Sequence, residues 1–284
     1  MKVGFIGLGH MGSAMARRLS EADVDLVVWN RSGEKTPSLR ATIAASPAEL
    51  ATQADVVFMS LADSDAVRAV LAGPDGVLTA ALAGKVVIDM TTNHFDAVGS
   101  FHEMVAASGG HYLETPVIGS VAPAAQGALT ILVSGSSQAF ERVRPYLEIV
   151  GSKIFFLEQP GRATKLKLIN NFVLGSLMCT LAEAVVFGEE VGLDKSTVLD
   201  ILAAGAGASA ILTGRRAKLE SDDFGSDFTI TLMYKDLHYA QDLARVLERP
   251  LFTGSIAKEC FALGLRGETP NEDIAAVYKA LRGF

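Results

Sequence analysis

Lys167 and Asn171 are the residues whose types and spacing most directly suggest chemistry. They lie four positions apart in the helix-patterned segment Lys165 to Asn171, so both side chains share one helix face, one turn apart. An ammonium group beside a carboxamide can protonate a carbonyl oxygen and hold it in place. Lys165 and Asn170 point to other faces. A lysine near a helix start is more often a solvated surface group, so the pair by itself leaves catalysis open.

A second set of residues could bind phosphate. Gly7, Gly9 and Gly12 form a Gly-x-Gly-x-x-Gly turn between the apolar run 3–6 and a helical pattern. The first two glycines let backbone approach a pyrophosphate, and the third lets the helix pack close to the strand. A glycine-rich turn without a ligand is the alternative, but the strand, turn, helix and second strand at 25–29 supply the required context. The cofactor-binding residues expected here are Gly7, Leu8, Gly9, His10, Met11 and Gly12.

The end of the second predicted strand indicates which dinucleotide binds. Enzymes that select NAD place Asp or Glu about 20 residues beyond the glycines, where a carboxylate accepts hydrogen bonds from the ribose hydroxyls. This chain has Asn30, Arg31 and Ser32 there. A guanidinium can bind the 2′-phosphate of NADP, and a hydroxyl can add a further bond. The sequence therefore predicts NADP(H), with an ordinary solvated loop arginine as the alternative for Arg31.

Composition excludes several classes of partner. The 284-residue chain is 49% hydrophobic, carries a net charge of −7, and has no run of Lys or Arg typical of nucleic-acid binding. Its two cysteines, Cys179 and Cys260, lie far apart without metal-ligand spacing, so we expect neither a disulfide framework nor a metal site. Both are interpreted as small buried hydrophobes in a reducing compartment. The expected partner is a small molecule.

The chain also lacks the pattern of a targeting or membrane segment. The first predicted strand begins at Lys2, which leaves no room for a leader peptide, so we expect a cytoplasmic protein. The most apolar stretch, 172–188, contains Glu183 and is flanked by charged residues. We therefore expect no membrane span, and a long helix buried between domains or subunits instead.

Hydrophobic periodicity divides the chain into two halves. Apolar runs at 3–6, 25–29, 56–59, 86–89, 112–114, 129–133 and 154–157 alternate with helical patterns. This predicts a Rossmann-type, doubly wound α/β domain over residues 1–161. Residues 162–284 read as helices only, interrupted by glycine- and proline-containing breaks, and predict an all-α domain opened by a long interdomain helix. Ligands bind beyond the carboxyl ends of such strands, so the site is expected between that edge and the helical half.

The residues resemble a known family, the β-hydroxyacid dehydrogenases, which include 3-hydroxyisobutyrate dehydrogenase and, as a longer relative, 6-phosphogluconate dehydrogenase. Four motifs in the family's order carry the resemblance. They are the turn at 7–12, the segment Glu114-Thr115-Pro116-Val117-Ile118-Gly119-Ser120 continuing to 127–130, Gly161 through Lys167 to Asn171, and Tyr234-Lys235-Asp236-Leu237.

The resemblance implies reversible hydride transfer between a nicotinamide and a short acid bearing an aldehyde, ketone or hydroxyl group. It assigns Lys167 as general acid and base, with Asn171 orienting substrate and lysine. It places the substrate carboxylate at Gly119 and Ser120. The remaining residues that it assigns are Leu61, Thr92 and Lys235 for the cofactor, and Lys235, Asp236 and Phe228 for the substrate. Ordinary strand-end and core packing is the alternative for Thr92 and Phe228.

Departures from the family pattern limit the choice of substrate. Ile118 replaces the usual serine, Ser120 replaces the second glycine, and Ala163 replaces a glycine of the catalytic motif. The combination of Asn30-Arg31-Ser32 with Gly119-Ser120 most resembles the NADPH-dependent glyoxylate and succinic semialdehyde reductases. We therefore expect an aldehyde acid as substrate.

Two other functions stay open. Imine reductases share the fold and the NADPH preference but typically replace the catalytic lysine, whereas a non-catalytic dinucleotide-binding protein would need only the fold. The long apolar helix also predicts a homodimer, or a tetramer, with helices packed across the interface.

Overall fold

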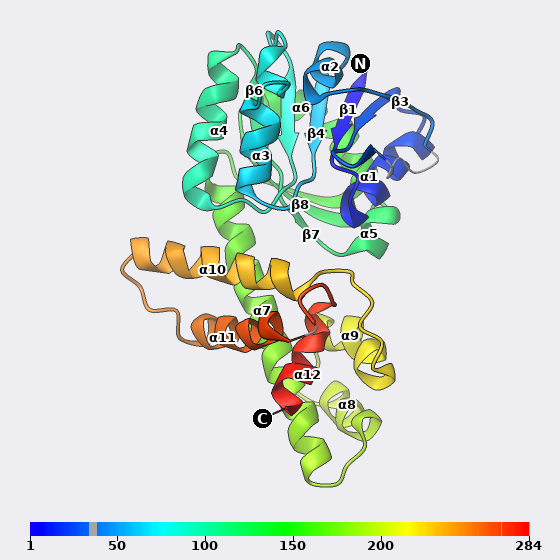
Figure 1. The fold of residues 1–284 in the computed structure, drawn as a ribbon, viewed down its shortest axis with the longest axis vertical. Coiled ribbons are helices and arrows are strands. Elements are labelled where there is room, and N and C mark those ends of the chain that lie inside the picture. Colours follow the sequence, from blue (N-terminus) through cyan, green and yellow to red (C-terminus); the bar gives the residue numbers. More distant parts are fainter. Residues whose placement is uncertain (34–38, 268, 284) are drawn as a thin grey trace. The chain divides into compact units, whose positions relative to one another are not determined.

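The computed structural model describes residues 1–33, 39–267 and 269–283. These residues form two compact units, Met1–Lys167 and Leu168–Phe284, which Figure 1 draws in one chain. The sequence places a domain boundary at 161/162, where helix α7 (Arg162–Glu190) begins, whereas the units meet inside this helix. Helix α7 therefore starts in the first unit and continues into the second.

The first unit contains a single mixed sheet of nine strands among the residues described. Its order is β3-β2-β1-β4-β5-β6-β8-β7, with β9 paired to β8. The pairs from β3 to β6 are parallel, β8 runs antiparallel to β6 and β7, and β9 is parallel to β8. The strands are β1 (Val3–Ile6), β2 (Leu26–Trp29), β3 (Ala41–Ile43), β4 (Val56–Met59), β5 (Val86–Asp89), β6 (His111–Glu114), β7 (Val117–Ile118), β8 (Leu129–Gly135) and β9 (Gly151–Phe156).

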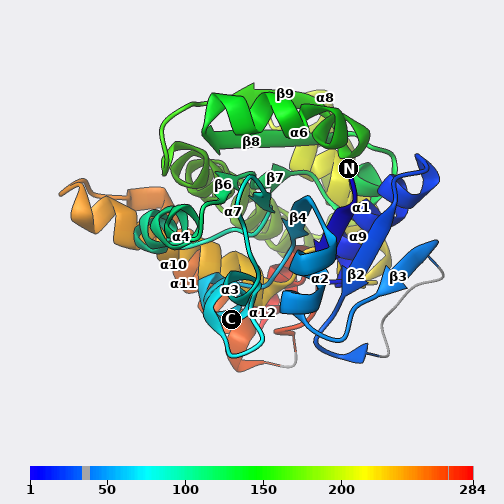
Figure 2. The ribbon, with the colours of Figure 1, turned by 90° about the horizontal axis from the view of Figure 1, so that it is seen from above.

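Helices cover both faces of this sheet, which explains why its central strands are almost continuously apolar and buried. Val3 and Phe5 face one hydrophobic cluster, with residues of α1, α5 and α6, whereas Ile6 faces a second cluster, with residues of α2, α3 and α4. Figure 2 shows α6 beside β8 and β9. The helices are α1 (His10–Glu21), α2 (Pro47–Gln53), α3 (Ser64–Ala72), α4 (Phe95–Ala107), α5 (Val121–Ala125) and α6 (Ser137–Val150).

Two strands were not expected from the sequence. Strand β3 has three residues, none of them fully buried, and β7 has two. Neither contains an apolar run long enough to stand out, because pairing with neighbouring strands, rather than local pattern, stabilises them. The seven expected strands are all present, and the doubly wound first half is confirmed.

The second unit is helical throughout its described part, apart from one isolated bridge between Thr229 and Asp273. Its helices end where the sequence has the expected breaks, at Gly192, 205–207, 222–226 and Pro250. The elements are the rest of α7, α8 (Lys195–Ala204), α9 (Ala210–Ser221), α10 (Ile230–Val246), α11 (Phe252–Arg266) and α12 (Val277–Arg282). The all-α second half is therefore confirmed.

Helix α7 combines unusual length with high apolarity. It has 29 residues, and its most apolar window has a mean hydropathy of 1.6, enough by length and composition to cross a membrane. About 44% of that window is buried within the protein. Core helices of soluble proteins have the same properties, so this feature by itself is weak support for a membrane span.

Candidate functional site

The carboxyl ends of the central parallel strands meet at one edge of the sheet. Ile6 pairs with both Trp29 and Met59, and Met59 pairs with Asp89, so the loops after β1, β2, β4 and β5 begin side by side. The strand order reverses between β1 and β4. This is the place where open α/β sheets bind ligands.

The glycine turn at this edge has the geometry that a phosphate-binding turn needs. Gly7 has a φ of +92°, and a Cβ atom there would collide with the backbone oxygen of Ser60. A Cβ on Gly12 would collide with the oxygen of Gly7, whereas one on Gly9 would meet no atom within 4 Å. Gly9 is the N-cap of α1 and provides no side-chain cap. The space at Gly9 is therefore open and no side chain caps the start of α1, as an anion site at a helix N-terminus requires.

Asn30 connects this turn to the end of β2. Its side-chain oxygen accepts a hydrogen bond from the Leu8 N–H at 3.0 Å, and its amide nitrogen donates to the backbone oxygen and hydroxyl of Ser32. Arg31 is exposed beside it. A cavity of about 280 Å³ opens here, lined by Val28, Trp29, Asn30, Arg31, Gly33, Ile43, Ala44 and Ala45. Its position next to the glycine turn fits the adenosine end of a dinucleotide.

The loop after β5 is organised by the buried carboxylate of Asp89, which is 1% exposed. Asp89 accepts hydrogen bonds from the backbone N–H of Thr91 at 2.9 Å, from Asn93 at 2.7 Å and from the Tyr112 hydroxyl at 2.5 Å. Burial raises the pKa of Asp89, although these hydrogen bonds oppose the rise. The Thr91 hydroxyl in turn accepts from the Leu61 N–H. Leu61 and the half-buried Thr92 are thus fixed at the edge that carries the glycine turn.

Glu114, at the end of β6, holds the first turn of α7. One of its oxygens accepts from the N–H and the hydroxyl of Thr164 at 3.1 and 2.7 Å, and the other accepts from the N–H of Gly161 and pairs with His102 at 3.2 Å. Burial raises the pKa of Glu114, but these hydrogen bonds outweigh burial and the net pKa is lowered. A buried carboxylate therefore satisfies the N–H groups at the start of the helix that carries Lys167.

Gly119 and Ser120 lie between β7 and α5. Gly119 has a φ of +136°, a conformation that a side chain would strain. Ser120 is the N-cap of α5, and its hydroxyl makes no cap hydrogen bond. Ile118, in place of the family's serine, is half-buried and pairs with Thr130 of β8.

Helix α7 places Lys167 and Asn171 one turn apart, as expected. Lys167 is 9% exposed and Asn171 is 1% exposed, whereas Lys165 is exposed. Within the second unit, Asn171 donates a hydrogen bond of 2.6 Å to Asp236 of α10. The other oxygen of Asp236 lies 3.3 Å from the Lys235 ammonium. Asp236 therefore links α7 to α10 and orients the Asn171 amide, in addition to the pairing with Lys235.

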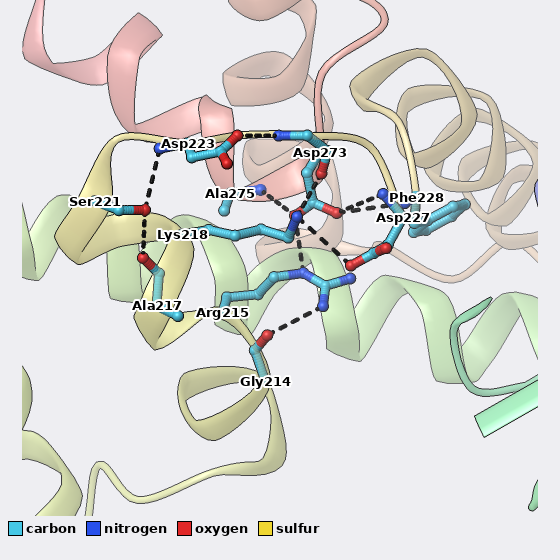
Figure 3. Close-up of polar contacts among 11 residues, drawn as sticks. Gly214, Arg215, Ala217, Lys218, Ser221, Asp223, Asp227, Phe228, Asp273 and Ala275 are labelled. Atoms are coloured by element: carbon cyan, nitrogen blue, oxygen red, sulfur yellow. Dashed lines mark hydrogen bonds and ion pairs between the residues drawn. The ribbon is translucent and has the colours of Figure 1, made fainter. Parts of the chain in front are cut away.

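Phe228 lies in a connection that a buried ion pair fixes, as Figure 3 shows. The fully buried carboxylate of Asp273 accepts from the backbone N–H groups of Asp227, Phe228 and Ala275 and pairs with Arg215 at 2.8 Å. Phe228 itself is half-buried and packs against the core of the second unit.

Sequence reasoning missed the roles of Glu114, Asp89 and Asp273. The first two each end an apolar run, which is a local signal that a polar group closes a buried strand. Asp273 has no such signal, because its partners lie about 45 to 60 residues earlier in the chain. Among the residues described, no group of three or more His, Cys, Asp or Glu could hold a metal ion.

Comparisons with known proteins find matches to both halves of the chain. Residues 2–158 match the family model of the NAD binding domain of 6-phosphogluconate dehydrogenase, and residues 161–281 match that of the NAD-binding of NADP-dependent 3-hydroxyisobutyrate dehydrogenase. The 2-(hydroxymethyl)glutarate dehydrogenase of Eubacterium barkeri is 32% identical over 98% of this chain and 94% of its own length. The cytokine-like nuclear factor N-PAC of Mus musculus is 33% identical over 98% of this chain, which spans about half of that relative.

Solved structures share the fold. A structure described as Psf3 in complex with NADP+ and 2-OPP matches 98% of this chain and 99% of its own, with a TM-score of 0.91 and 30% identity. An imine reductase from Pseudomonas sp. matches 99% of both chains with a TM-score of 0.67 and 22% identity, a likeness of fold alone. The family models, the relatives and the architecture agree, and the chain belongs to the β-hydroxyacid dehydrogenase family, whose first domain binds a nicotinamide dinucleotide.

Proposed function

We propose that this protein is an NADPH-dependent oxidoreductase that interconverts a short aldehyde or keto acid and its hydroxy acid. One observation carries the proposal: Lys167 and Asn171 lie one turn apart on α7, both buried, and Asn171 is held by Asp236. A buried lysine beside an oriented carboxamide is an arrangement suited to proton transfer rather than to surface solvation.

The residues of the first unit support a dinucleotide at the sheet edge. The open space at Gly9 and the start of α1 suit a pyrophosphate, and the cavity bordered by Asn30 and Arg31 suits the adenosine. Arg31 and Ser32 would hold a 2′-phosphate, which favours NADP over NAD. Leu61, Thr92 and, from the second unit, Lys235 would contact the nicotinamide end.

In the reducing direction the cofactor, when bound, supplies a hydride to the carbonyl carbon. The Lys167 ammonium donates a proton to the carbonyl oxygen, which neutralises the developing alkoxide. In the oxidising direction the neutral Lys167 amine accepts that proton. Asn171 has two N–H donors, of which one binds Asp236, so the second can orient the reacting oxygen.

The substrate carboxylate would bind at the backbone N–H of Gly119 and at the Ser120 hydroxyl. This hydroxyl makes no cap hydrogen bond to α5. Phe228 would supply an apolar wall, and Asp236 would keep Lys235 and Asn171 in place. Ile118 makes the pocket more apolar than the family's usual serine would, so the substrate is expected to differ from that of the commonest relatives. The combination of Asn30-Arg31-Ser32 with Gly119-Ser120 resembles the glyoxylate and succinic semialdehyde reductases, which favours an aldehyde acid such as glyoxylate or succinic semialdehyde.

A panel assay tests this function. In the reducing direction, the purified protein is incubated with NADPH or NADH and with glyoxylate, succinic semialdehyde or a cyclic imine. In the oxidising direction, it is incubated with NADP+ or NAD+ and a β-hydroxy acid. The expected result is that an aldehyde acid is reduced faster with NADPH than with NADH. Turnover of the imine alone would replace the proposal by imine reduction, and cofactor binding without any turnover would favour a non-catalytic dinucleotide-binding protein.

Replacing Lys167 tests the mechanism. Lys167→Ala should lower kcat by about 10²- to 10⁴-fold, the range expected for loss of a general acid, because no other group would protonate the carbonyl oxygen. NADPH affinity, measured by fluorescence titration, should change little. Lys165→Ala is the matched control, since Lys165 is exposed on another face of the same helix turn. Equal activity of the Lys167 variant and the control would refute the role.

A further inference from the structure

The two cysteines of the chain meet in the core of the second unit, although they lie far apart in sequence. Cys179 is on α7, and its sulfur lies 3.8 Å from the carbonyl oxygen of Ala257 on α11. Cys260 follows Ala257 by one helical turn and packs against the hydrophobic cluster that contains Cys179. The fold therefore brings together the only two thiols that the sequence provides.

The two thiols differ in exposure. Cys179 is 5% exposed within the hydrophobic cluster that α7 and α11 share, whereas Cys260 lies at the edge of that cluster and is partly exposed. The interaction between the two thiols raises the pKa of Cys179 and lowers that of Cys260, while burial and the charge of Glu183 oppose ionisation of both. Exposure and ionisation thus both favour Cys260 as the sulfur that reacts first, because the thiolate is the nucleophile.

Metal binding does not explain this pair. A structural metal site needs about four ligands, and among the described residues no third His, Cys, Asp or Glu completes a set with the two sulfurs. A disulfide needs two cysteines on adjoining backbone segments. The contact of the Cys179 sulfur with Ala257, one turn before Cys260, places the first thiol against the helix that carries the second.

We propose that Cys179 and Cys260 form an oxidant-sensitive dithiol site that hydrogen peroxide converts into an intramolecular disulfide between α7 and α11. The Cys260 sulfur attacks one peroxide oxygen, the O–O bond breaks, and a sulfenic acid forms while the other oxygen leaves as water. The Cys179 sulfur then attacks the sulfenic sulfur, the S–S bond forms and the S–O bond breaks, and the hydroxyl leaves with the Cys179 proton as a second water. Two thiols thereby lose two electrons, and one hydrogen peroxide is reduced to two waters.

The disulfide would close a loop that contains α8, α9 and α10, and α10 carries Lys235 and Asp236. Closing a long loop restricts the unfolded chain, so the oxidised protein should melt at a higher temperature than the reduced protein. No step of this chemistry uses Lys167 or the nicotinamide cofactor, so it does not depend on the proposed reductase activity.

Mass spectrometry of the full chain tests the proposal. After treatment with hydrogen peroxide and removal of excess oxidant, the intact monomer should be lighter by two hydrogen atoms, and a digest should contain the Cys179 and Cys260 peptides joined. Dithiothreitol should restore the mass of the reduced monomer and separate the two peptides. The proposal is overturned if both thiols remain open to alkylation, if Cys260 is overoxidised without a cross-link, or if the only disulfide joins two chains.

Two serine variants test the order of the steps. In Cys179→Ser, Cys260 should still be oxidised but should stop at a sulfenic acid that dimedone traps. In Cys260→Ser, Cys179 should react with alkylating agents more slowly than Cys260 does in Cys179→Ser, by on the order of tenfold or more, because Cys179 is buried and protonated. Circular dichroism checks that both variants are folded. Equal trapping of a sulfenic acid in the two variants would refute the proposed order of steps, in which Cys260 reacts first with the peroxide.

Discussion

Asn30 and Arg31 have separate tasks at the end of β2. The Asn30 side chain joins the glycine turn to the strand through Leu8 and Ser32, so it is committed to holding the loop. Arg31 is exposed beside the cavity and is available to a ligand. We therefore propose that Arg31, rather than Asn30, selects between the two dinucleotides.

Arg31→Asp should weaken NADPH binding by about 10- to 100-fold and leave NADH binding nearly unchanged. A hydrogen bond to a charged group contributes about 1.5–3 kcal/mol, and the new carboxylate would in addition repel the 2′-phosphate. Fluorescence titration with both cofactors measures the ratio. Arg40→Asp, which makes the same charge change at an exposed arginine, is the control. An unaltered NADPH-to-NADH ratio in the Arg31 variant would exclude Arg31 as the selecting residue.

Helix α7 is positioned at its start by a buried carboxylate, and this makes its anchoring sensitive to pH. The pKa of Glu114 is lowered in the folded protein, because its hydrogen bonds outweigh the burial that would raise it. A carboxyl group with a depressed folded pKa contributes stability above its ordinary value of 4.5, and this contribution is lost as the pH falls through the folded pKa.

Glu114→Gln should therefore lower the free energy of unfolding of the first unit by about 2 kcal/mol at pH 7, because the amide group offers weaker acceptors to Gly161 and Thr164. The difference in unfolding free energy between wild type and variant should become smaller as the pH falls below 4.5. Urea unfolding followed by the fluorescence of Trp29, the single tryptophan of the chain, measures both. A difference in unfolding free energy that stays constant as the pH falls well below 4.5 would contradict a role for the charge.

The connection between α9 and α10 depends on Asp273 in a similar way. Asp273→Ala should lower the free energy of unfolding of the second unit by about 3 to 5 kcal/mol, because it leaves the Arg215 guanidinium buried without its partner. Urea unfolding followed by circular dichroism should measure this loss of stability, because the second unit is helical. Asp223→Ala, at an exposed position in the same connection, should shift it far less. An equal shift in both variants would show that the ion pair contributes little.

At the scale of the whole molecule, α7 leaves an apolar stripe uncovered. Ile169, Val173 and Leu177 lie along one side of the helix and are 44 to 47% exposed, and Phe187 farther along is 73% exposed. A stripe of this kind commonly packs against a second copy of the same helix. We propose that it forms the interface of a homodimer.

Light scattering after size-exclusion chromatography should give twice the mass of the chain, or four times if dimers pair. Val173→Asp combined with Leu177→Asp should yield a monomer, because two carboxylates would be buried at the interface. Gln138→Asp, at an exposed polar position of α6, is the control. A monomeric wild-type protein at micromolar concentration would refute the homodimer.

Much of the fold follows from local sequence patterns. Continuous apolar runs predict the central strands, because both faces of each strand are buried, and glycine and proline breaks predict where the helices of the second unit end. The glycine turn and the spacing of Lys167 and Asn171 are also readable in sequence, since each needs only a few consecutive residues. The short strands β3 and β7 were not predictable, because pairing with neighbours forms them.

Local motifs are enough to predict the residues that carry chemistry: the turn at Gly7 to Gly12, Arg31, and the pair Lys167 and Asn171. The contacts that hold them are visible only in the folded chain, where Glu114 binds the start of α7 and Asp236 binds Asn171. It also decided that Cys179 and Cys260 are neighbours, where the sequence suggested two unrelated buried thiols. The physical reason is that motifs and periodicity report contacts along one element, whereas buried polar and thiol pairs join elements whose separation in sequence leaves no local pattern.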